Sequence, residues 1–515
     1  MSQTTAVWEP IPGTSQELAL DTRCHHTLYH GTRGPGKTIT QLMRFRRYVG
    51  VGYGKFWRGI IFDREFKNLS DLVAQSNKVF PEFEDGAKWL GSPTSYKWVW
   101  PTGEELFFSH IKKIQDYDRF HGHEYSFVGY NELTKFPTDE LYKKMMSVNR
   151  SSFLPEEHTP MELVDGERLY CTPDRKPLPN IPLEVFSTTN PNGPGHNWVK
   201  RMFIDPAAPG EIVTKEFDVF NPRTGKQEVI KRTQVAIFGS YRENRYLDPS
   251  YVAGLEEMTE NNPNLKAAWL KGDWSVNAGG AIDDLWRDNV HVIKRFPIPY
   301  NWRIDRSFDW GSTAPFSVGW WAESNGEEIE DGNGETIFFP KGTLIQIAEW
   351  YGSDGDESSV GLKMAAKDVA VGIKKIEQLL MMGWIERKPS AGPADNEIRN
   401  VRESDVDTIE LKMADEGVRW ERSDKSPGSR INGLQLFRDR LLASLRKEGP
   451  GIYFMNNCKA SVYTLPSLPR DPDNMDDVDT TSEDHCWDMC RYRVLAASNR
   501  LATSLDVKFA NSGTR

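Results

Sequence analysis

One eight-residue segment constrains the fold of this 515-residue chain more than any other feature. Residues 31–38 read GTRGPGKT and match the pattern G-x-x-x-x-G-K-[ST] in full. The segment follows an apolar run at Thr27–His30 and precedes a helical pattern at Lys37–Val49. In that context it predicts a strand, a phosphate-binding loop and a helix, whose glycine N–H groups and helix dipole attract phosphate. The sequence therefore predicts a nucleotide-binding α/β domain.

The loop contains the residue types that a site for ATP and Mg²⁺ needs. Lys37 would pair with the β- and γ-phosphates, and the Thr38 hydroxyl would ligate Mg²⁺. The backbone of the whole loop is expected to surround the phosphates. The predicted loop residues are Gly31, Thr32, Arg33, Gly34, Pro35, Gly36, Lys37 and Thr38.

An apolar strand that ends in acidic or amide residues is the expected second half of such a site. Phe127–Tyr130 is an apolar run followed by Asn131 and Glu132. Glu132 would polarise the attacking water, and Asn131 stands where an aspartate normally supports Mg²⁺. Because charged hydrogen bonds are about twice as strong as neutral ones, Asn131→Asp is expected to lower the Mg²⁺ requirement. If this strand is the wrong one, Asp63 or Glu65 becomes the candidate.

Two arginines are candidates for contacting the transferred phosphate. Arg33 lies inside the loop, and Arg119 lies in the segment DRFHG ahead of the second strand. Arg119 is placed to act as an arginine finger on the nucleotide of a neighbouring subunit. The alternative for either residue is an ordinary surface charge.

Length and composition predict more than one domain. A chain of 515 residues exceeds what one hydrophobic core supports. We expect a P-loop ATPase domain over 1–271 with a small helical lid at about 245–271, a glycine-rich linker at 272–282, and a second α/β domain over 283–515. No apolar run of 18 residues and no signal-peptide pattern occur, so no membrane association is expected. Five scattered cysteines without a CxxC pair argue against a disulfide or zinc framework.

The net charge of -10 does not by itself indicate a DNA-binding protein. The excess acidic charge lies in the second half of the sequence, where a few carboxylates are candidates for metal ligands and the rest are solvated. DNA contacts must therefore be local. The candidate basic groups are Arg44, Arg46 and Arg47; Lys143, Lys144 and Arg150; and Lys425 with Arg430.

Taken in order, three segments resemble the large terminase subunits of tailed bacteriophages. They are GTRGPGKT, FVGYNELTKF and FSTTNPNGPGHNWVKRMFID. The resemblance continues through NRYLDPSY and LKAAWLKGDW, and resumes with SFDWGS, PADN, KSPGSRINGL and DHCWDMCRY. Asn131 departs from the family, which usually has an aspartate there. The resemblance implies that Ser187–Asn190 couples hydrolysis to movement, with Asn190 at the nucleotide, and that Gln16 reads adenine.

The same resemblance implies an RNase H-like nuclease domain after the linker. Such a site holds two Mg²⁺ or Mn²⁺ ions about 4 Å apart between carboxylates. Asp309 and Asp395 stand at predicted strand ends, and the family's third acidic motif matches Asp488. The supporting groups on the same predicted helix are Asp484 and His485. Asp305 is the rival of Asp309, four residues earlier on the same strand.

The family also implies partners: double-stranded DNA, a small terminase subunit that selects the target, and the portal protein of a procapsid. A homo-oligomeric ring, a pentamer, would act transiently on the procapsid in the host cytoplasm and be absent from the mature virion. One alternative is a helicase- or translocase-nuclease of DNA repair type without a capsid role. Another is a capsid-assembly or scaffold protein with a vestigial nucleotide site, which the intact Lys37, Thr38 and Glu132 disfavour.

Overall fold

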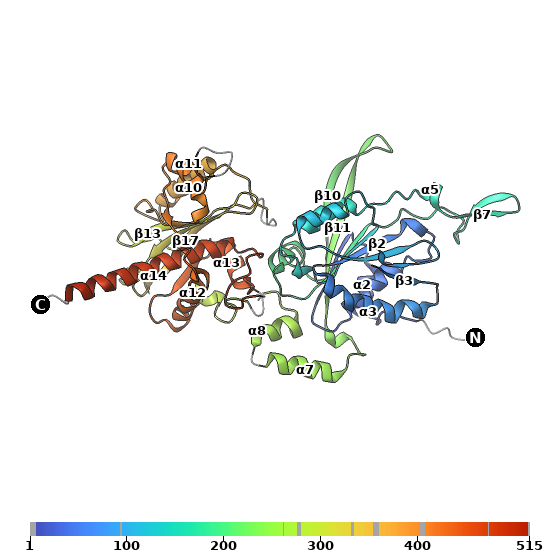
Figure 1. The fold of residues 1–515 in the computed structure, drawn as a ribbon, viewed down its shortest axis with the longest axis horizontal. Helices are drawn as coiled ribbons and strands as arrows, with labels where there is room; N and C mark the ends of the chain where they lie inside the picture. The colour runs from blue at the N-terminus through green and yellow to red at the C-terminus, as the bar shows by residue number, and fades with distance from the viewer. Residues whose placement is uncertain are drawn as a thin grey trace. The chain divides into compact units, whose positions relative to one another are not determined.

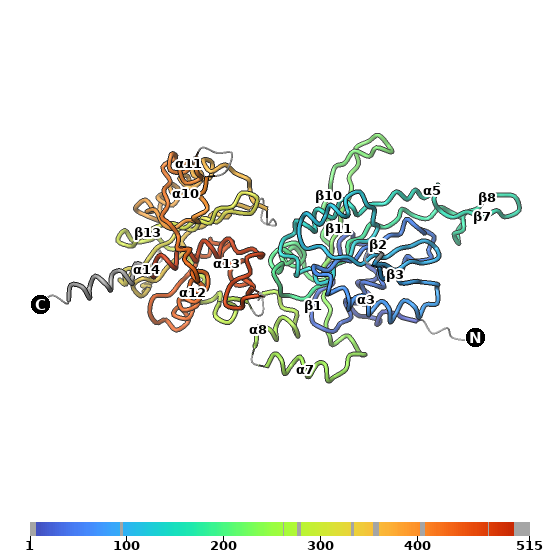
Figure 2. The backbone as a smooth tube through the Cα atoms, in the orientation of Figure 1, coloured from blue at the N-terminus to red at the C-terminus, as the bar shows by residue number. Residues whose placement is uncertain are grey.

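The computed structural model describes residues 7–92, 95–260, 262–275, 280–330, 334–353, 360–401, 407–471 and 473–512. The chain divides into two compact units, Met1–Val276 and Asn277–Arg515 (Figures 1 and 2). Each unit has its own sheet and its own hydrophobic clusters. The division falls within the segment 272–282, of which residues 276–279 lie outside the described residues.

Nine strands of the described chain form the sheet of the first unit, in the order β10-β11-β1-β9-β6-β2-β5-β4-β3. The strands from β11 to β5 are parallel, and β10, β4 and β3 add antiparallel edges. The parallel strands are β1 His26–Gly31, β2 Arg58–Asp63, β5 Glu105–His110, β6 Phe127–Tyr130, β9 Glu184–Thr188 and β11 Lys226–Gly239. The edge strands are β3 Lys88–Ser92, β4 Ser95–Val99 and β10 Ile212–Asn221.

Helices cover both faces of this sheet because its central strands are apolar on both sides. Tyr29 and Ile61 pack in the cluster that also contains residues of α2 (Lys37–Arg46) and α3 (Leu69–Val79). Their neighbours Leu28 and Ile60 point the opposite way, into a cluster on the other face. That second cluster contains residues of α4 (Glu140–Met145) and α6 (His196–Val199). The remaining elements before the lid are α1 Ser15–Asp21, α5 Pro155–His158, β7 Met161–Val164 and β8 Glu167–Tyr170.

The structure confirms the elements predicted around the loop. The predicted strand Phe127–Tyr130 is β6 residue for residue, and the strand at Thr27–His30 is one residue longer at each end. The helix after the loop ends at Arg46 rather than Val49, because the chain turns toward Gly50 (φ 75°). The helical pair predicted at 249–271 is present as α7 (Pro249–Thr259), α8 (Pro263–Lys266) and a π-helical turn at Ala267–Lys271.

The sheet of the second unit contains seven described strands in the order β12-β20-β17-β14-β13-β18-β19. Antiparallel pairing joins β13 to β14 and β14 to β17, whereas β18 and β19 add in parallel beside β13. This mixed sheet is the RNase H-like arrangement that was predicted. The strands are β12 Val292–Ile293, β13 Arg303–Asp309, β14 Ser317–Glu323, β17 Leu344–Tyr351, β18 Pro393–Ala394, β19 Glu421–Arg422 and β20 Ile452–Met455; β15 Glu328–Glu330 and β16 Thr336–Phe338 form a separate hairpin.

Two hydrophobic clusters cover the faces of the second sheet. One contains residues of α10 (Ala366–Met381) and α11 (Ile409–Asp415), and the other contains residues of α12 (Ser429–Arg446) and α14 (His485–Ser512). The shorter helices are α9 Asp288–His291 and α13 Lys459–Thr464. In the described part of the chain, no helix combines the length and apolar character that crossing a membrane requires.

Candidate active sites

The loop at 31–38 leaves β1 and enters α2 with a backbone that needs its glycines. Gly31, Gly34 and Gly36 have φ angles of 131°, 102° and 89°, which side-chain-bearing residues rarely adopt. A Cβ atom on Gly31 would also lie 2.1 Å from the carbonyl oxygen of Gly239. The loop therefore packs directly against the end of β11, and its N–H groups lead into the N-terminus of α2.

Lys37 is the buried cation of this loop. Its Nζ atom donates to the Thr32 carbonyl oxygen and to Asn190 Oδ1, both at 2.7 Å. Burial lowers the pKa of Lys37 to about 8, while Glu132 raises it and nearby Arg33 lowers it further. Both partners are neutral acceptors, so an anionic phosphate would be the stronger partner for the ammonium group.

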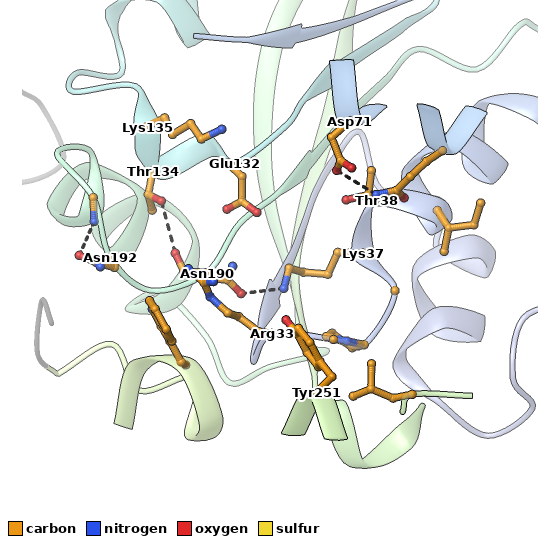
Figure 3. A pocket seen from close by; sticks show the side chains of 18 residues that line it. Arg33, Lys37, Thr38, Asp71, Glu132, Thr134, Lys135, Asn190, Asn192 and Tyr251 are labelled. Atoms are coloured by element: carbon orange, nitrogen blue, oxygen red, sulfur yellow. Dashed lines mark hydrogen bonds between the residues drawn. The ribbon is translucent and has the colours of Figure 1, made fainter. Parts of the chain in front are cut away.

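A cavity of about 730 Å³ opens at the loop. It is lined by polar residues from the sheet edge and the loop and by residues of the lid (Figure 3). Among them, the hydroxyl of Thr38 and the carboxylates of Asp71 and Glu132 offer oxygen ligands, the type that Mg²⁺ prefers. The polar side chains and oxygen ligands of this lining are therefore chemically suited to a nucleotide with its Mg²⁺.

Glu132 follows β6 in a strained conformation. Its φ and ψ angles of 57° and 66° lie in the left-handed region, which is unfavourable for a residue with a side chain. Its N–H donates to Thr188 Oγ1 at 3.4 Å, and Thr134 and Thr189 share a hydroxyl hydrogen bond of 2.8 Å. These contacts join the end of β6 to the segment 187–190, whose Asn190 binds Lys37.

Asn131 faces a buried carboxylate. Its Nδ2 atom donates to Asp63 Oδ2 at 2.9 Å, and its Oδ1 accepts a 3.5 Å hydrogen bond from the Thr188 hydroxyl. Asp63 ends β2, its side chain is fully buried, and it also binds Lys135 Nζ at 3.0 Å. Neither Asn131 nor Asp63 belongs to the cavity lining that the structure describes. The amide therefore holds Asp63 at the sheet edge, whereas its predicted contact with Mg²⁺ stays a prediction.

The other predicted nucleotide residues lie in three different surroundings. Gln16 is buried behind the loop, where its Nε2 donates to the Pro35 carbonyl oxygen at 2.9 Å. The Arg33 guanidinium stacks 3.6 Å from the ring centre of Trp269 in the lid. Arg119 is half-exposed and donates to the His110 carbonyl oxygen at 2.8 Å, outside the described lining of the cavity.

The predicted nuclease carboxylates meet at one edge of the second sheet. Asp309 ends β13, and Asp395 directly follows β18, which pairs in parallel with β13 through Phe308 and Ala394. Asp484 immediately precedes α14, which carries Asp488 in its first turn. The sheet register and the helix start thus bring together side chains from positions about 180 residues apart in sequence.

Burial and mutual repulsion shape the charges of this cluster. Burial raises the pKa of Asp309 to about 6, the hydrogen bond from His485 opposes the shift, and the charges of Asp488 and Asp395 add to it. Burial and Asp488 likewise raise the pKa of Asp484. Burial opposes but does not prevent a raised pKa of His485, which lies with Nδ1 3.2 Å from Asp309 Oδ2. The raised pKa favours a protonated His485 that donates to Asp309 at neutral pH.

Basic side chains pair with the same carboxylates. Lys425 Nζ lies 2.5 Å from Asp395, and Arg430 and Arg491 lie 3.3 Å and 2.9 Å from Asp488. Among the described residues, no group of three or more His, Cys, Asp or Glu side chains is arranged to hold a metal ion. The donor chemistry suits divalent cations because crowded, buried carboxylates gain most from them. Metal binding would require Lys425, Arg430 and Arg491 to release these ion pairs.

Asp305, the rival of Asp309, is a structural residue. Its side chain is fully buried and forms ion pairs of 2.6 Å with Arg493 and 3.0 Å with Arg303. These ion pairs give Asp305 a structural role, because removing one partner would leave an uncompensated buried charge.

The predicted basic groups differ in exposure. Arg44 is buried against Glu184 at 2.6 Å, so the group at 44–47 is not a DNA-facing surface as a set. Lys143 and Arg150 are half-exposed but pair with Asp139 and Glu124. Cys486 and Cys490 on α14 are buried.

No protein-family model matches the chain, and no curated protein matches it. Solved structures that resemble it include large terminases of bacteriophages. One from a thermophilic bacteriophage is 14% identical with a TM-score of 0.37, over 94% of this chain and 98% of that one. The bacteriophage HK97 large terminase is 8% identical with a TM-score of 0.42, over 92% and 91%. The P22 nuclease domain is 13% identical with a TM-score of 0.28, over 41% and 89%.

Sequence reasoning missed several residues around the cavity. Asp71 of α3 lies near Thr38, and Tyr251 reaches toward the loop from α7 (Figure 3). Trp269 lines the cavity beneath Arg33. Asp71 belongs to none of the segments that carry the family resemblance, whereas Tyr251 lies in NRYLDPSY and Trp269 in LKAAWLKGDW, so membership of those two segments was a usable signal.

Proposed function

We propose that this chain is a viral DNA-packaging motor that hydrolyses ATP to move double-stranded DNA and cuts that DNA with a separate nuclease site. One observation carries the proposal. Buried Lys37 and the partly buried Asn190 and Glu132 line a single cavity at the end of the strand that precedes the P-loop. We infer that the loop and the ends of β6 and β9 supply a phosphate-binding cation, a carboxylate and a polar side chain to one place.

The motor chemistry follows from these side chains. The N–H groups of the loop and Lys37 bind the phosphates, and Glu132 orients and polarises the attacking water. Thr38 would hold Mg²⁺, which when bound offsets the charge that develops on the phosphates. Because Asn190 binds Lys37 in this structure, phosphate binding would free the 187–190 segment from the lysine. This exchange of partners at Lys37 would couple the state of the bound nucleotide to the segment 187–190, which we expect to drive movement. Arg119 would act on a neighbouring subunit.

The nuclease chemistry rests on the carboxylate cluster. We propose that Asp309, Asp395 and Asp488 hold two Mg²⁺ or Mn²⁺ ions, which when bound activate water and stabilise the leaving oxygen. Asp484 supports Asp488, and protonated His485 fixes the orientation of Asp309 through their 3.2 Å hydrogen bond. Lys425 and Arg430 would turn to DNA phosphates once the metals take their carboxylates.

The proposed partners follow from the resemblance to large terminases: double-stranded DNA, a small terminase subunit and the portal of a procapsid. The working form would be a homo-oligomeric ring, a pentamer, in the host cytoplasm. ATP hydrolysis measured with DNA alone, and with DNA plus portal-bearing procapsids, tests this role. We expect procapsids to increase the rate, and a Lys37→Ala control to remain inactive in both. A rate that DNA raises and procapsids leave unchanged would contradict the packaging role.

A further inference from the structure

The two ends of the nucleotide cavity differ in chemistry. Lys37 marks the phosphate end. Arg33, Glu132, Thr134 and Asn190 are among the polar side chains of the lining, which also include Thr38, Asp71, Gln75, Lys135 and Asn192. The apolar lining consists of Ile39, Leu247, Tyr251 and Trp269. Trp269 is covered by the Arg33 guanidinium at 3.6 Å. A nucleoside extending past the start of α2 therefore meets Ile39, Leu247 and Tyr251.

The Gln16 side chain is hydrogen-bonded to the loop itself. Its Nε2 donates to the Pro35 carbonyl oxygen at 2.9 Å, and its Oε1 accepts from the Ile11 N–H at 3.3 Å. The side chain is 6% exposed, and a Cβ atom on Gly36 would lie 2.3 Å from its Nε2. The Nε2 half of the amide thus supports the loop backbone, and the Oε1 half holds the segment ahead of α1. Reading a base edge would require Gln16 to abandon both hydrogen bonds, which is costly for a buried amide.

The lid presents an apolar wall that is attached to the loop. Leu247 packs beside Gly34, where an added Cβ would lie 2.9 Å from its Cδ2 atom, and Asn244 Nδ2 donates to the Gly34 carbonyl oxygen at 2.8 Å. Tyr251 follows in the first turn of α7 and is 43% exposed. Figure 3 shows its ring reaching toward the loop, across the cavity from Glu132. These contacts hold an aromatic face beside the loop.

We propose that the purine base is bound by stacking on Tyr251 and by contact with Leu247 of the lid, and that Gln16 does not read it. Stacking tolerates any base because every base has an aromatic face, whereas discrimination requires unpaired hydrogen-bonding groups aimed at the base edge. Stacking on Tyr251 alone would distinguish adenine from guanine poorly. This inference rests on the proposed nucleotide-binding function of the cavity.

Competition against a fluorescent ATP analogue tests it, with ATP, GTP and inorganic tripolyphosphate as competitors on the full chain. We expect ATP and GTP to bind within about threefold of each other, because stacking is insensitive to the base. Tyr251→Ala should weaken both on the order of tenfold and leave tripolyphosphate within about twofold. Tyr251→Phe, which keeps the ring, should restore the nucleotide affinity. Gln16→Ala should weaken ATP and tripolyphosphate by the same factor.

Two results would overturn the inference: a large preference for ATP over GTP that Gln16→Ala abolishes, or an equal loss of tripolyphosphate and ATP affinity in Tyr251→Ala. The second would place Tyr251 at the phosphates. Tripolyphosphate binding also separates this inference from the proposed function. If the wild-type chain binds tripolyphosphate no better than Lys37→Ala does, the cavity is not a phosphate site and both proposals fail.

Discussion

Replacing Asn131 by aspartate tests whether the amide serves Asp63 or a metal ion. Asn131 Nδ2 donates to Asp63 Oδ2 at 2.9 Å, and the Asp63 side chain is fully buried. In Asn131→Asp a second carboxylate would replace that donor. Lys135 Nζ, 3.0 Å from the same Asp63 oxygen, can neutralise only one of the two charges.

The cost can be estimated from the 2.9 Å separation. Two unit charges at that distance repel by about 6 kcal/mol at an effective dielectric constant near 20. The pair avoids this by keeping one proton, which costs a carboxyl group of ordinary pKa about 4 kcal/mol at pH 7 and about 1.5 kcal/mol at pH 5. The cost of protonation is smaller than the cost of repulsion, so protonation sets the expected loss of unfolding free energy. The variant should therefore be destabilised at neutral pH and recover most of its stability in mild acid.

Urea-induced unfolding at pH 7 and pH 5 measures this, with wild type, Asn131→Asp, Asp63→Asn and the double variant Asp63→Asn/Asn131→Asp. The double variant restores a single acid beside a single amide, so it should regain most of the stability that Asn131→Asp loses. An Asn131→Asp protein as stable as wild type at pH 7, with a lower Mg²⁺ midpoint for ATP hydrolysis, would contradict the structural role. The amide would then face the metal, as the sequence alone suggests.

Three further predictions concern other parts of the chain. Asp309→Asn should slow plasmid cleavage on the order of 100-fold or more, because it neutralises a carboxylate at the nuclease site, and leave ATP hydrolysis unchanged; normal cleavage would remove Asp309 from the site. Mixing Arg119→Ala with Glu132→Gln should restore about a quarter of wild-type ATPase, the share of interfaces with an intact finger and an intact acid. No recovery in an assembled ring would make Arg119 a surface residue. Burial lowers the pKa of His30 to about 3 and of His196 to about 4. Between pH 6.5 and pH 5 each histidine therefore takes up a proton in the unfolded chain but not in the folded one. The free energy of unfolding should fall by about 2 kcal/mol per histidine over that range. Urea unfolding of His196→Gln should show a shallower loss, and an unchanged slope would contradict this.

The elements around the loop were predictable because their signals are local. A full P-loop pattern between an apolar run and a helical pattern specifies strand, loop and helix within 20 residues, and the strand Phe127–Tyr130 was matched residue for residue. The predicted carboxylates Asp309 and Asp395 do stand at adjacent strand ends. Position at the end of a strand is a property that a single segment reveals.

Contacts between distant segments could not be predicted from the sequence. The hydrogen bond from Asn131 to Asp63 depends on β2 lying beside β6 in the sheet, which neither segment encodes alone. The same holds for Gln16, whose place behind Pro35 follows from the packing of α1 against α2. Tyr251 faces the cavity because the chain returns to the loop after β11. Partner choice across such distances is set by tertiary packing, not by local pattern.

A DNA-packaging assay tests the central claim most directly, namely that one chain drives DNA movement and cuts DNA from two separate sites. The measurement is the amount of nuclease-protected DNA in portal-bearing procapsids, with linear DNA cut in advance, for wild type, Glu132→Gln and Asp309→Asn. We predict that Glu132→Gln protects no DNA, because the water loses its polarising carboxylate. Asp309→Asn should protect as much as wild type, since pre-cut DNA needs no nuclease. Wild-type levels of protected DNA with Glu132→Gln, or no protected DNA with any of the three proteins, would contradict the account.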